Sequence, residues 1–213
     1  MSDKKGSYRS RLIGFIARHG ETELNNSNCF RSWIDVALNP TGIQQAHEAA
    51  KFLKDKQIVN CISSPLLRAF VTADILAASH RLTVFQHRGL FPWRLGVFSG
   101  LPRKDNDAAL KLFIDNPKVN MPGGESLEDF EERQWAFWQT ALRQARERGL
   151  TLFVAHTSNV VALENMTSDT PSATPEQSES VKPGGVAAIY WDGKKHRIEP
   201  VFGKSEPAKF GGS

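Results

Sequence analysis

Apolar runs alternate with longer amphipathic stretches along this chain. Short apolar runs at 11–17, 60–64 and 150–155 end in loop-forming residues, and each predicts a buried strand. A fourth run, at 185–191, has the same character near the end of the chain. The stretches between the first three runs repeat apolar residues at helical spacing. The pattern is therefore one of strands separated by helices.

Capping residues define where these helices begin and end. A helix start is predicted at 39–41, where Asn, Pro and Thr precede an amphipathic stretch. Ser64 is a natural N-cap for a second helix, expected over 65–79 with proline at its first position. The stretch 126–149 opens with Ser and Asp in capping-box spacing and closes on Gly. This alternation predicts an α/β fold, with a mostly parallel central sheet flanked by helices on both faces, in a single domain over 1–213.

Two segments interrupt the alternation. The segment 91–125 is rich in Pro and Gly around one short helix, expected near 108–114, which suggests an insertion. The segment 165–180 is almost devoid of apolar residues and predicts a mobile loop.

Composition and charge set broad limits. The formal charge of +4 permits an anionic partner, but Lys and Arg are spread along the chain, so a nucleic-acid binder is not favoured. Two cysteines give neither a disulfide framework nor a zinc cluster and favour a reduced, cytoplasmic chain. No apolar run approaches membrane-spanning length, so no membrane partner is expected. A homodimer is compatible with the sequence.

Basic and imidazole side chains follow all three of the first predicted strands. Arg18 and His19 end the first strand, Arg68 lies in the first turn of the helix after the second, and His156 ends the third, followed by Thr157 at a helix start. In an open parallel sheet, ligands bind outside the carboxyl ends of the strands. Guanidinium groups and helix N-termini both bind phosphate oxygens. These strand ends therefore predict a phosphate site.

Each of these residues also has a simpler interpretation. A histidine after a strand is more often a structural residue than a catalyst, and an arginine in a first helical turn is usually solvated. Their joint placement at three strand ends favours a site. The remaining four histidines have no such context and no metal-ligand spacing, so we expect them to be surface or packing residues: His47, His80, His87 and His196.

Five ordered segments resemble the successive motifs of a known family. They are similar to those of the histidine phosphatase superfamily, in the branch that resembles cofactor-dependent phosphoglycerate mutase. The resemblance runs from about Leu12 to Val160 and rests on "RHGETELN" (18–25), "NCFRSWIDVALNPTGIQQA" (28–46), "SSPLLRAFVTA" (63–73), "GGESLEDFEER" (123–133) and "VAHTSNV" (154–160).

The resemblance implies a phosphoglycerate mutase-like fold and a transient phosphohistidine at His19. Arg18, Arg68 and His156 would surround the phosphoryl group. Nearby guanidinium charges would keep the imidazole neutral and ready to attack near neutral pH. The chemistry needs no metal and no organic cofactor.

The resemblance also implies residues that bind the substrate. Asn25 falls where the family has an asparagine facing the phosphate, and Thr22 lies on the same loop. Thr157 replaces a glycine that is more common in the family after the histidine, but it should still offer its backbone N–H. The expected partner is a small phosphorylated substrate.

One position departs from the family pattern. The family commonly carries "L-x-E" here, with the glutamate as general acid and base, whereas this chain has Pro92 within "GLFPWRLGVFSG". Proline cannot transfer a proton. Glu125 or Glu21 could replace the glutamate from another loop. For Glu125, we favour loop capping over this catalytic role.

The segment 91–125 would set substrate choice. Trp93, Arg94 and Phe98 could contact a base, a ring or a second anionic group, although Trp93 and Phe98 could equally be packing residues. Three functions stay open: a phosphatase for a small phosphorylated metabolite or nucleotide, a mutase that re-delivers its phosphate, and a non-catalytic phospho-ligand-binding protein. The retained residues at the strand ends count against the non-catalytic protein, and the missing glutamate counts against the mutase, so the phosphatase is favoured.

Overall fold

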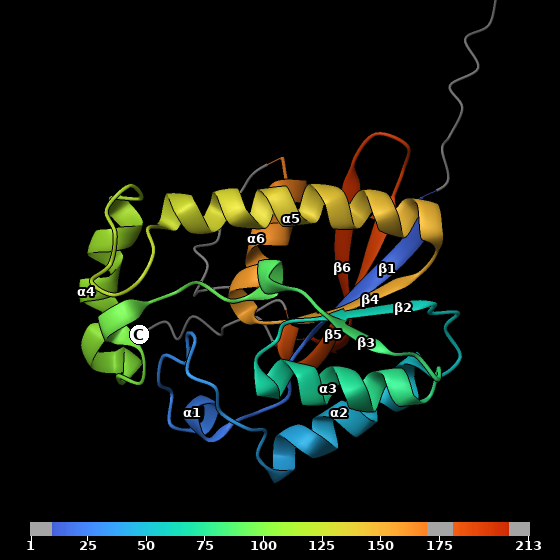
Figure 1. The fold of residues 1–213 in the computed structure, drawn as a ribbon, viewed down its shortest axis with the longest axis horizontal. Coiled ribbons are helices and arrows are strands. Elements are labelled where there is room, and N and C mark those ends of the chain that lie inside the picture. Colours follow the sequence, from blue (N-terminus) through green and yellow to red (C-terminus); the bar gives the residue numbers. More distant parts are fainter. Residues whose placement is uncertain (1–9, 170–180, 205–213) are drawn as a thin grey trace, which may run out of the picture.

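A six-stranded mixed sheet forms the centre of the molecule in the computed structural model, which describes residues 10–169 and 181–204 (Figure 1). The strand order is β3-β2-β4-β1-β5-β6. Pairing is parallel from β3 to β1 and antiparallel at β5 and β6. The expected α/β fold is thus confirmed, with two antiparallel strands added at one side. The strands are β1 (Arg11–Arg18), β2 (Asn60–Ser63), β3 (Val84–Gln86), β4 (Thr151–Ala155), β5 (Val181–Trp191) and β6 (His196–Lys204).

Helices cover both faces of this sheet, as predicted. In Figure 1, α5 and α6 lie on one side of the strands and α2 and α3 on the other. The described helices are α1 (Glu23–Asn26), α2 (Pro40–Leu53), α3 (Leu67–Ala78), α4 (Arg103–Asp115), α5 (Leu127–Arg148) and α6 (Thr157–Thr167), with short 3-10 turns η1 (Arg88–Leu90) and η2 (Gly96–Phe98).

Alternation along the central strands divides the core into two layers. On β4, Phe153 faces the helices α5 and α6, whereas Leu152 and Val154 face α2 and α3. The side chains of β1 also alternate between the two layers, beyond an irregularity in its pairing with β5 between Leu12 and Gly14. Because both faces of these strands are buried, they appear in the sequence as continuous apolar runs.

A third core lies under the segment between η1 and α5. Trp93 and Phe98 are buried there with Leu110 of α4 and Phe130 of α5. The helix expected near 108–114 is real but begins five residues earlier, at Arg103. An Arg103–Asp107 ion pair of 3.6 Å links the first turn to the next, and Asp105 suits the positive end of the helix dipole.

Two other predicted boundaries are wrong. The helix expected over 65–79 begins only at Leu67, because the backbone at Leu66 is extended. The Ser64 side chain does not cap this helix. The expected loop 165–180 starts too early, since α6 continues to Thr167, whose hydroxyl donates to the carbonyl of Leu163. Residues 170–180 lie outside the described part of the chain.

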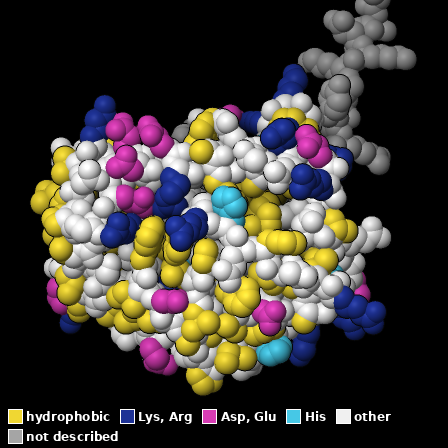
Figure 2. Space-filling view, in the orientation of Figure 1, with side chains coloured by type: hydrophobic (Ala, Val, Ile, Leu, Met, Phe, Trp, Pro, Cys, Tyr) yellow, Lys and Arg dark blue, Asp and Glu magenta, His cyan; other side chains and the backbone are white. Residues whose placement is uncertain are grey.

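The surface carries no concentrated basic stripe on the face shown in Figure 2, where Lys and Arg lie among Asp and Glu. Among the described residues, no helix is long and apolar enough to span a membrane.

Candidate functional site

The three strands that end in basic and imidazole residues are neighbours in the sheet. β4 lies between β2 and β1 and pairs in parallel with both. Just beyond the strands, the N–H of His19 donates to the carbonyl of Ala155 (3.0 Å), and the N–H of Ser64 donates to that of Val154 (3.0 Å). Residues from three distant parts of the sequence therefore meet at one edge. We call Arg18, His19, Arg31, Arg68 and His156 the arginine–histidine cluster.

His19 is almost fully buried, and its hydrogen bonds define its tautomer. Nδ1 lies 2.7 Å from the carbonyl oxygen of Gly20. Because a carbonyl can only accept, Nδ1 carries the proton and Nε2 keeps its lone pair. The Nε–H of Arg68 donates to this Nε2 atom (3.3 Å). The ring thus presents a neutral nitrogen on the side of the guanidinium group.

Arg68 is held on its other side by two backbone carbonyls. Nη1 donates to Ile34 (2.7 Å) and Nη2 to Ser32 (2.8 Å), so its orientation is fixed. Burial and the charge of Arg31 lower the pKa of Arg68 to about 9, opposed by Asp35. That pKa still lies above neutral pH, so the guanidinium group remains charged.

The pKa of the His19 imidazole is well below its ordinary value. Burial is the largest cause. The positive charges of Arg68, Arg31 and Arg18 act in the same direction, while the hydrogen bond to Gly20 opposes them. The expectation that arginines keep this ring neutral is consistent with these causes, although burial contributes more.

Arg31 is a member of the cluster that sequence patterns do not single out. Its half-buried side chain projects from the loop between α1 and α2, and its charge lowers the pKa of both His19 and His156. The loop is shaped by Ser32, whose φ of 46° is in the left-handed region. The Ser32 hydroxyl donates to Trp93 O (3.2 Å) and accepts from Leu95 N (2.8 Å). No local sequence pattern reveals this turn.

His156 lies against His19, with 5.1 Å between the ring centroids. Its Nε2 atom is 2.8 Å from the hydroxyl oxygen of Ser64. Burial first, and then Arg68 and the other positive charges of the cluster, lower the pKa of His156 well below its ordinary value. Ser64 therefore orients an imidazole instead of capping a helix, which corrects its predicted role.

The loop residues Thr22 and Asn25 are bonded to each other. The Thr22 hydroxyl donates to Asn25 Oδ1 (2.9 Å) and accepts from Asn25 N (3.3 Å), which caps α1. Thr157 is the first residue of α6, and its hydroxyl oxygen is buried without a hydrogen-bond partner in the described chain. Substrate binding by these three residues stays a prediction.

The position expected to hold the general acid contains none. Pro92 is buried, and its carbonyl accepts from Trp33 Nε1 (2.9 Å) and from Arg133 Nη2 (3.3 Å). Glu125 pairs with the same Arg133 (2.6 Å) and accepts from the backbone N–H of Arg94 (3.0 Å). These contacts fit the loop-capping alternative for Glu125.

The Glu21 carboxylate is occupied by a hydrogen bond from the N-cap residue of α2. Its Oε1 atom accepts from Asn39 Nδ2 (2.9 Å), next to the start of α2. Neither Glu21 nor Glu125 is among the charges that shift the pKa of His19 or His156.

The side chains expected to contact the rest of a substrate divide into two kinds. Trp93 and Phe98 are buried in the third core, as the packing alternative predicts. Arg94 is exposed, with its guanidinium carbon 5.2 Å from the ring centroid of Trp33. Arg94 is therefore the one of the three that a ligand can reach.

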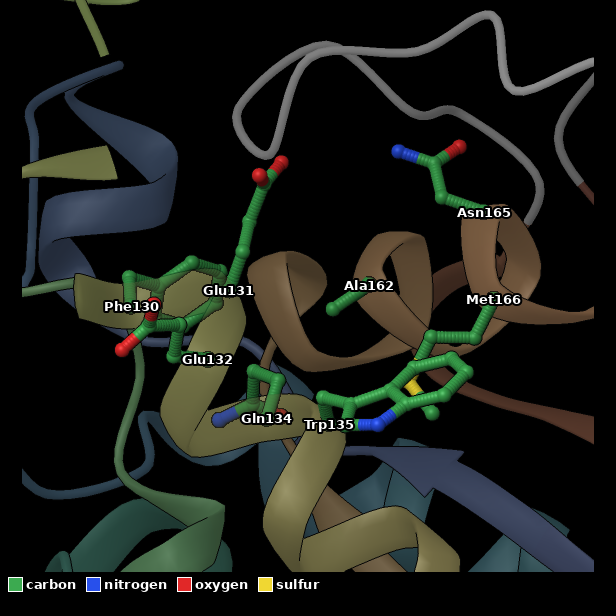
Figure 3. Close-up of a pocket in the computed structure, with 8 residues that line it drawn as sticks. All are labelled: Phe130, Glu131, Glu132, Gln134, Trp135, Ala162, Asn165 and Met166. Atoms are coloured by element: carbon green, nitrogen blue, oxygen red, sulfur yellow. The ribbon is translucent and has the colours of Figure 1, made fainter. Parts of the chain in front are cut away.

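A separate cavity of about 460 Å³ lies between α5 and α6 (Figure 3). Trp135 and Met166 lie side by side along it, with Ala162 on α6 between the two helices. It includes no residue of the arginine–histidine cluster. In residues 10–169 and 181–204, no group of three or more His, Cys, Asp or Glu could hold a metal ion.

Solved structures place this architecture among phosphoglycerate mutase-like α/β folds. The chain superposes on a mycobacterial hydrolase with a TM-score of 0.76 at 25% identity, covering 93% of this chain and 100% of that one. It also superposes on an α-ribazole phosphatase from Shigella flexneri with a TM-score of 0.76 at 22% identity, covering 92% of this chain and 98% of that one. On a phosphoglycerate mutase from Bacillus anthracis the TM-score is 0.73 at 22% identity, with 88% of this chain and 91% of that one covered.

Sequence comparison then identifies the family. The family model described as histidine phosphatase superfamily (branch 1) matches residues 15–202, and the chain belongs to this superfamily. A 2,3-bisphosphoglycerate-dependent phosphoglycerate mutase from Streptococcus thermophilus is 30% identical over 187 residues, 70% of this chain and 80% of that protein. Phosphoglycerate mutase-like protein 4 from Arabidopsis thaliana is 40% identical over 126 residues, but the match spans only 55% of each chain.

Proposed function

We propose that this protein is a phosphatase that works through a phosphohistidine at His19. Its substrate would be a small phosphorylated metabolite or a nucleotide. The observation that carries the proposal is the tautomer of His19, since Nδ1–H is bound to the Gly20 carbonyl and the Nε2 lone pair faces Arg68. A neutral nitrogen nucleophile beside fixed guanidinium groups suits attack on a phosphoryl group.

The reaction would proceed in two transfers. The Nε2 lone pair attacks phosphorus, and the bond to the leaving oxygen breaks with its electron pair on that oxygen. The ring becomes positively charged, and the Nδ1–H bond to the carbonyl of Gly20 stabilises that charge. Water then attacks phosphorus, the P–N bond breaks, the electron pair returns to Nε2, and dihydrogen phosphate leaves with both protons of the water.

The cationic residues would bind the transferred oxygens. Arg18, Arg68 and the backbone N–H of Thr157 at the start of α6 are the donors we assign to this role. His156, oriented by Ser64, would donate to a phosphoryl oxygen. Asn25 and Arg94 are assigned to the substrate beyond the phosphoryl group.

A substrate panel tests the proposal. Nucleotides, sugar phosphates, phosphoglycerates and aryl phosphates are offered to the wild type and to His19→Ala, and released phosphate is measured. We expect hydrolysis of at least one class, abolished by His19→Ala. Tight phosphate binding with no turnover on any class would favour a non-catalytic binding protein instead.

A mutase is the second candidate because a relative named as a mutase, from Streptococcus thermophilus, matches the chain at 30% identity. A mutase must return the phosphoryl group to a bound intermediate and needs an acid and base for the exchange. The same panel discriminates, since a mutase would interconvert phosphoglycerates in the presence of 2,3-bisphosphoglycerate faster than it releases phosphate.

A further inference from the structure

The imidazole of His156 is bound at one ring nitrogen and open at the other. Nε2 lies 2.8 Å from the hydroxyl oxygen of Ser64, whereas Nδ1 is buried and has no hydrogen-bond partner among the described residues. The residue is only 3% exposed and lies against His19, with 5.1 Å between the ring centroids. A buried polar atom without a partner is costly. Nδ1 therefore indicates a group that the described chain does not supply.

The other polar side chains in the first turn of α6 show how unusual this nitrogen is. The hydroxyl of Ser158 accepts from the backbone N–H of Trp93 (3.2 Å), and Oδ1 of Asn159 accepts from the backbone N–H of His156 (3.2 Å). The hydroxyl oxygen of Thr157, like Nδ1 of His156, is buried with no partner in residues 10–169 and 181–204. Two open polar atoms thus lie on consecutive residues, beside the nucleophile that we propose.

The hydrogen bonds of Ser64 decide which nitrogen of His156 carries the proton. The Ser64 hydroxyl oxygen accepts from the N–H of Leu66 (3.4 Å), and within the described chain its own proton has one acceptor, Nε2 of His156. If Nε2 donated instead, the hydroxyl proton would have no acceptor. Burial and the nearby positive charges lower the pKa of His156, so the ring holds a single proton. With Nε2 accepting from Ser64, that proton lies on Nδ1.

The two histidines then have the same tautomer and use it in opposite ways. In His19, Nδ1–H is bound to the carbonyl of Gly20 and the Nε2 lone pair is available for attack. In His156, the Nε2 lone pair is bound to Ser64 and Nδ1–H is open. A lone pair at this Nδ1 atom would repel phosphoryl oxygens, whereas an N–H attracts them. A neutral imidazole holds its proton tightly, so this N–H donates a hydrogen bond without replacing the missing general acid.

We propose that Ser64 is a positioning residue that holds His156 in the Nδ1–H tautomer, so that Nδ1–H donates to an oxygen of the phosphoryl group transferred to His19. This inference rests on the proposed phosphatase function and assigns the donor atom within it. No covalent bond changes in this contact, and the hydrogen bond strengthens as negative charge develops on the oxygen. Ser64 acts through the imidazole, so its hydroxyl should affect the rate only while that ring is present.

A double-mutant cycle separates this positioning role from a purely structural one. The kcat/KM for nitrophenyl phosphate is measured for the wild type, Ser64→Ala, His156→Ala and the double variant. We expect losses of roughly tenfold for Ser64→Ala and roughly a hundredfold for His156→Ala. The double variant should match His156→Ala, because Ser64 acts only through the ring. Ser63→Ala, which removes the neighbouring buried hydroxyl of β2, is the control and should stay close to the wild type. Losses that multiply in the double variant would overturn the inference.

Nitrogen NMR of the wild type reads the tautomer without any variant having to fold. In protein isotope-labelled at the histidine nitrogens, a protonated ring nitrogen and one with a lone pair have well-separated chemical shifts. We expect a protonated Nδ1 and an unprotonated Nε2 for His156, and a larger change at Nδ1 than at Nε2 when orthophosphate is added. A proton on Nε2, or bound orthophosphate that leaves Nδ1 unchanged, would overturn the inference. Failure of the phosphatase proposal would instead appear as nitrophenyl phosphate hydrolysis that survives His19→Ala, whatever the tautomer of His156.

Discussion

Arg68 donates a hydrogen bond from Nε to the Nε2 atom of His19, at 3.3 Å, while both terminal nitrogens of the guanidinium group are bound to backbone carbonyls. The arginine is thus anchored independently of the histidine. A phosphoryl group arriving at Nε2 would take over the Nε donor without requiring Arg68 to move far. The nucleophile that we propose, His19, and the guanidinium group of Arg68 are therefore positioned before a ligand binds.

Replacing Arg68 should be far more damaging than replacing a histidine outside the cluster. Arg68→Ala removes a preorganised charge, and we expect a loss of kcat on the order of a hundredfold or more. Arg68→Lys keeps the charge but cannot bind both carbonyls, so it should recover only part of the rate. His47→Ala, on the exposed side of α2, is the control. Steady-state rates that are similar for Arg68→Ala and His47→Ala would place Arg68 outside the reaction.

Pro92, at the position where the family resemblance places an acidic residue, leads us to predict a steep dependence of rate on leaving-group pKa. General acid catalysis contributes roughly 10² to 10⁴ in rate, and it should be missing selectively for poor leaving groups. We expect a series of aryl phosphates to be hydrolysed much faster than alkyl phosphates such as phosphoglycerate. Pro92→Glu could flatten this dependence, although losing proline also frees the local backbone.

The wild-type slope is the cleaner measurement. If rates are insensitive to the leaving group while chemistry is rate-limiting, then a proton donor is present. Glu125 and Glu21 would be the next residues to substitute.

The positions of the predicted site residues follow from parallel strands having their carboxyl ends at one edge. Arg18, His19 and His156 come directly after apolar runs, so their meeting point could be predicted from the sequence. Arg31 and Ser64 could not. The position of Arg31 depends on an irregular loop in which Ser32 has a left-handed backbone conformation. Ser64 has the sequence context of a helix cap, so its contact with an imidazole is not apparent from the sequence.

The antiparallel side of the sheet was also less predictable. The run at 185–191 marks only the later part of β5, because the residues before it include Pro183 and Gly184. β6 is an edge strand of the sheet, with β5 as its neighbour, and its sequence mixes charged and apolar residues. Such an edge strand lacks the continuous apolar run of β1 or β4.

The two buried histidines predict a loss of stability in mild acid. Their folded-state pKa values lie well below the ordinary 6.5, so both rings are neutral in the folded protein, whereas the unfolded chain takes up protons near that pH. The stabilising contribution of each neutral ring should thus be fully present above about pH 6.5. Below that pH the free energy of unfolding should fall, by up to about 1.4 kcal/mol per pH unit for each ring.

Urea unfolding of the wild type and of His156→Asn, at about pH 7.5 and 5.5, isolates one ring's contribution. The variant should lose less stability between the two conditions than the wild type does. His47→Asn, at an exposed position of α2, should behave as the wild type. An identical acid loss in His156→Asn would show that this ring is not held neutral by the fold.

A close contact between Gly20 and Gly42 holds the loop after His19 against α2. A Cβ on Gly42 would overlap the backbone oxygen of Glu21, and one on Gly20 would overlap that of Gly42. Gly42→Ala should therefore lower the free energy of unfolding by about 1–3 kcal/mol and reduce activity by displacing His19. Thr41→Ala, at an exposed neighbouring position, should change neither by a comparable amount. Equal thermal stability of Gly42→Ala and Thr41→Ala would show that the backbone at Gly42 has room for a Cβ, which would contradict this contact.

The phosphohistidine itself is the most direct test of the central claim. The wild type is mixed with a labelled phosphate donor, quenched rapidly in alkali, and the two phosphohistidine isomers are separated. We expect an acid-labile, alkali-stable label on Nε2 of His19, because Nδ1 is protonated and bound to Gly20. The label should vanish in His19→Ala. A label on Nδ1, a label that persists in His19→Ala, or turnover with no labelled histidine at any time would contradict it.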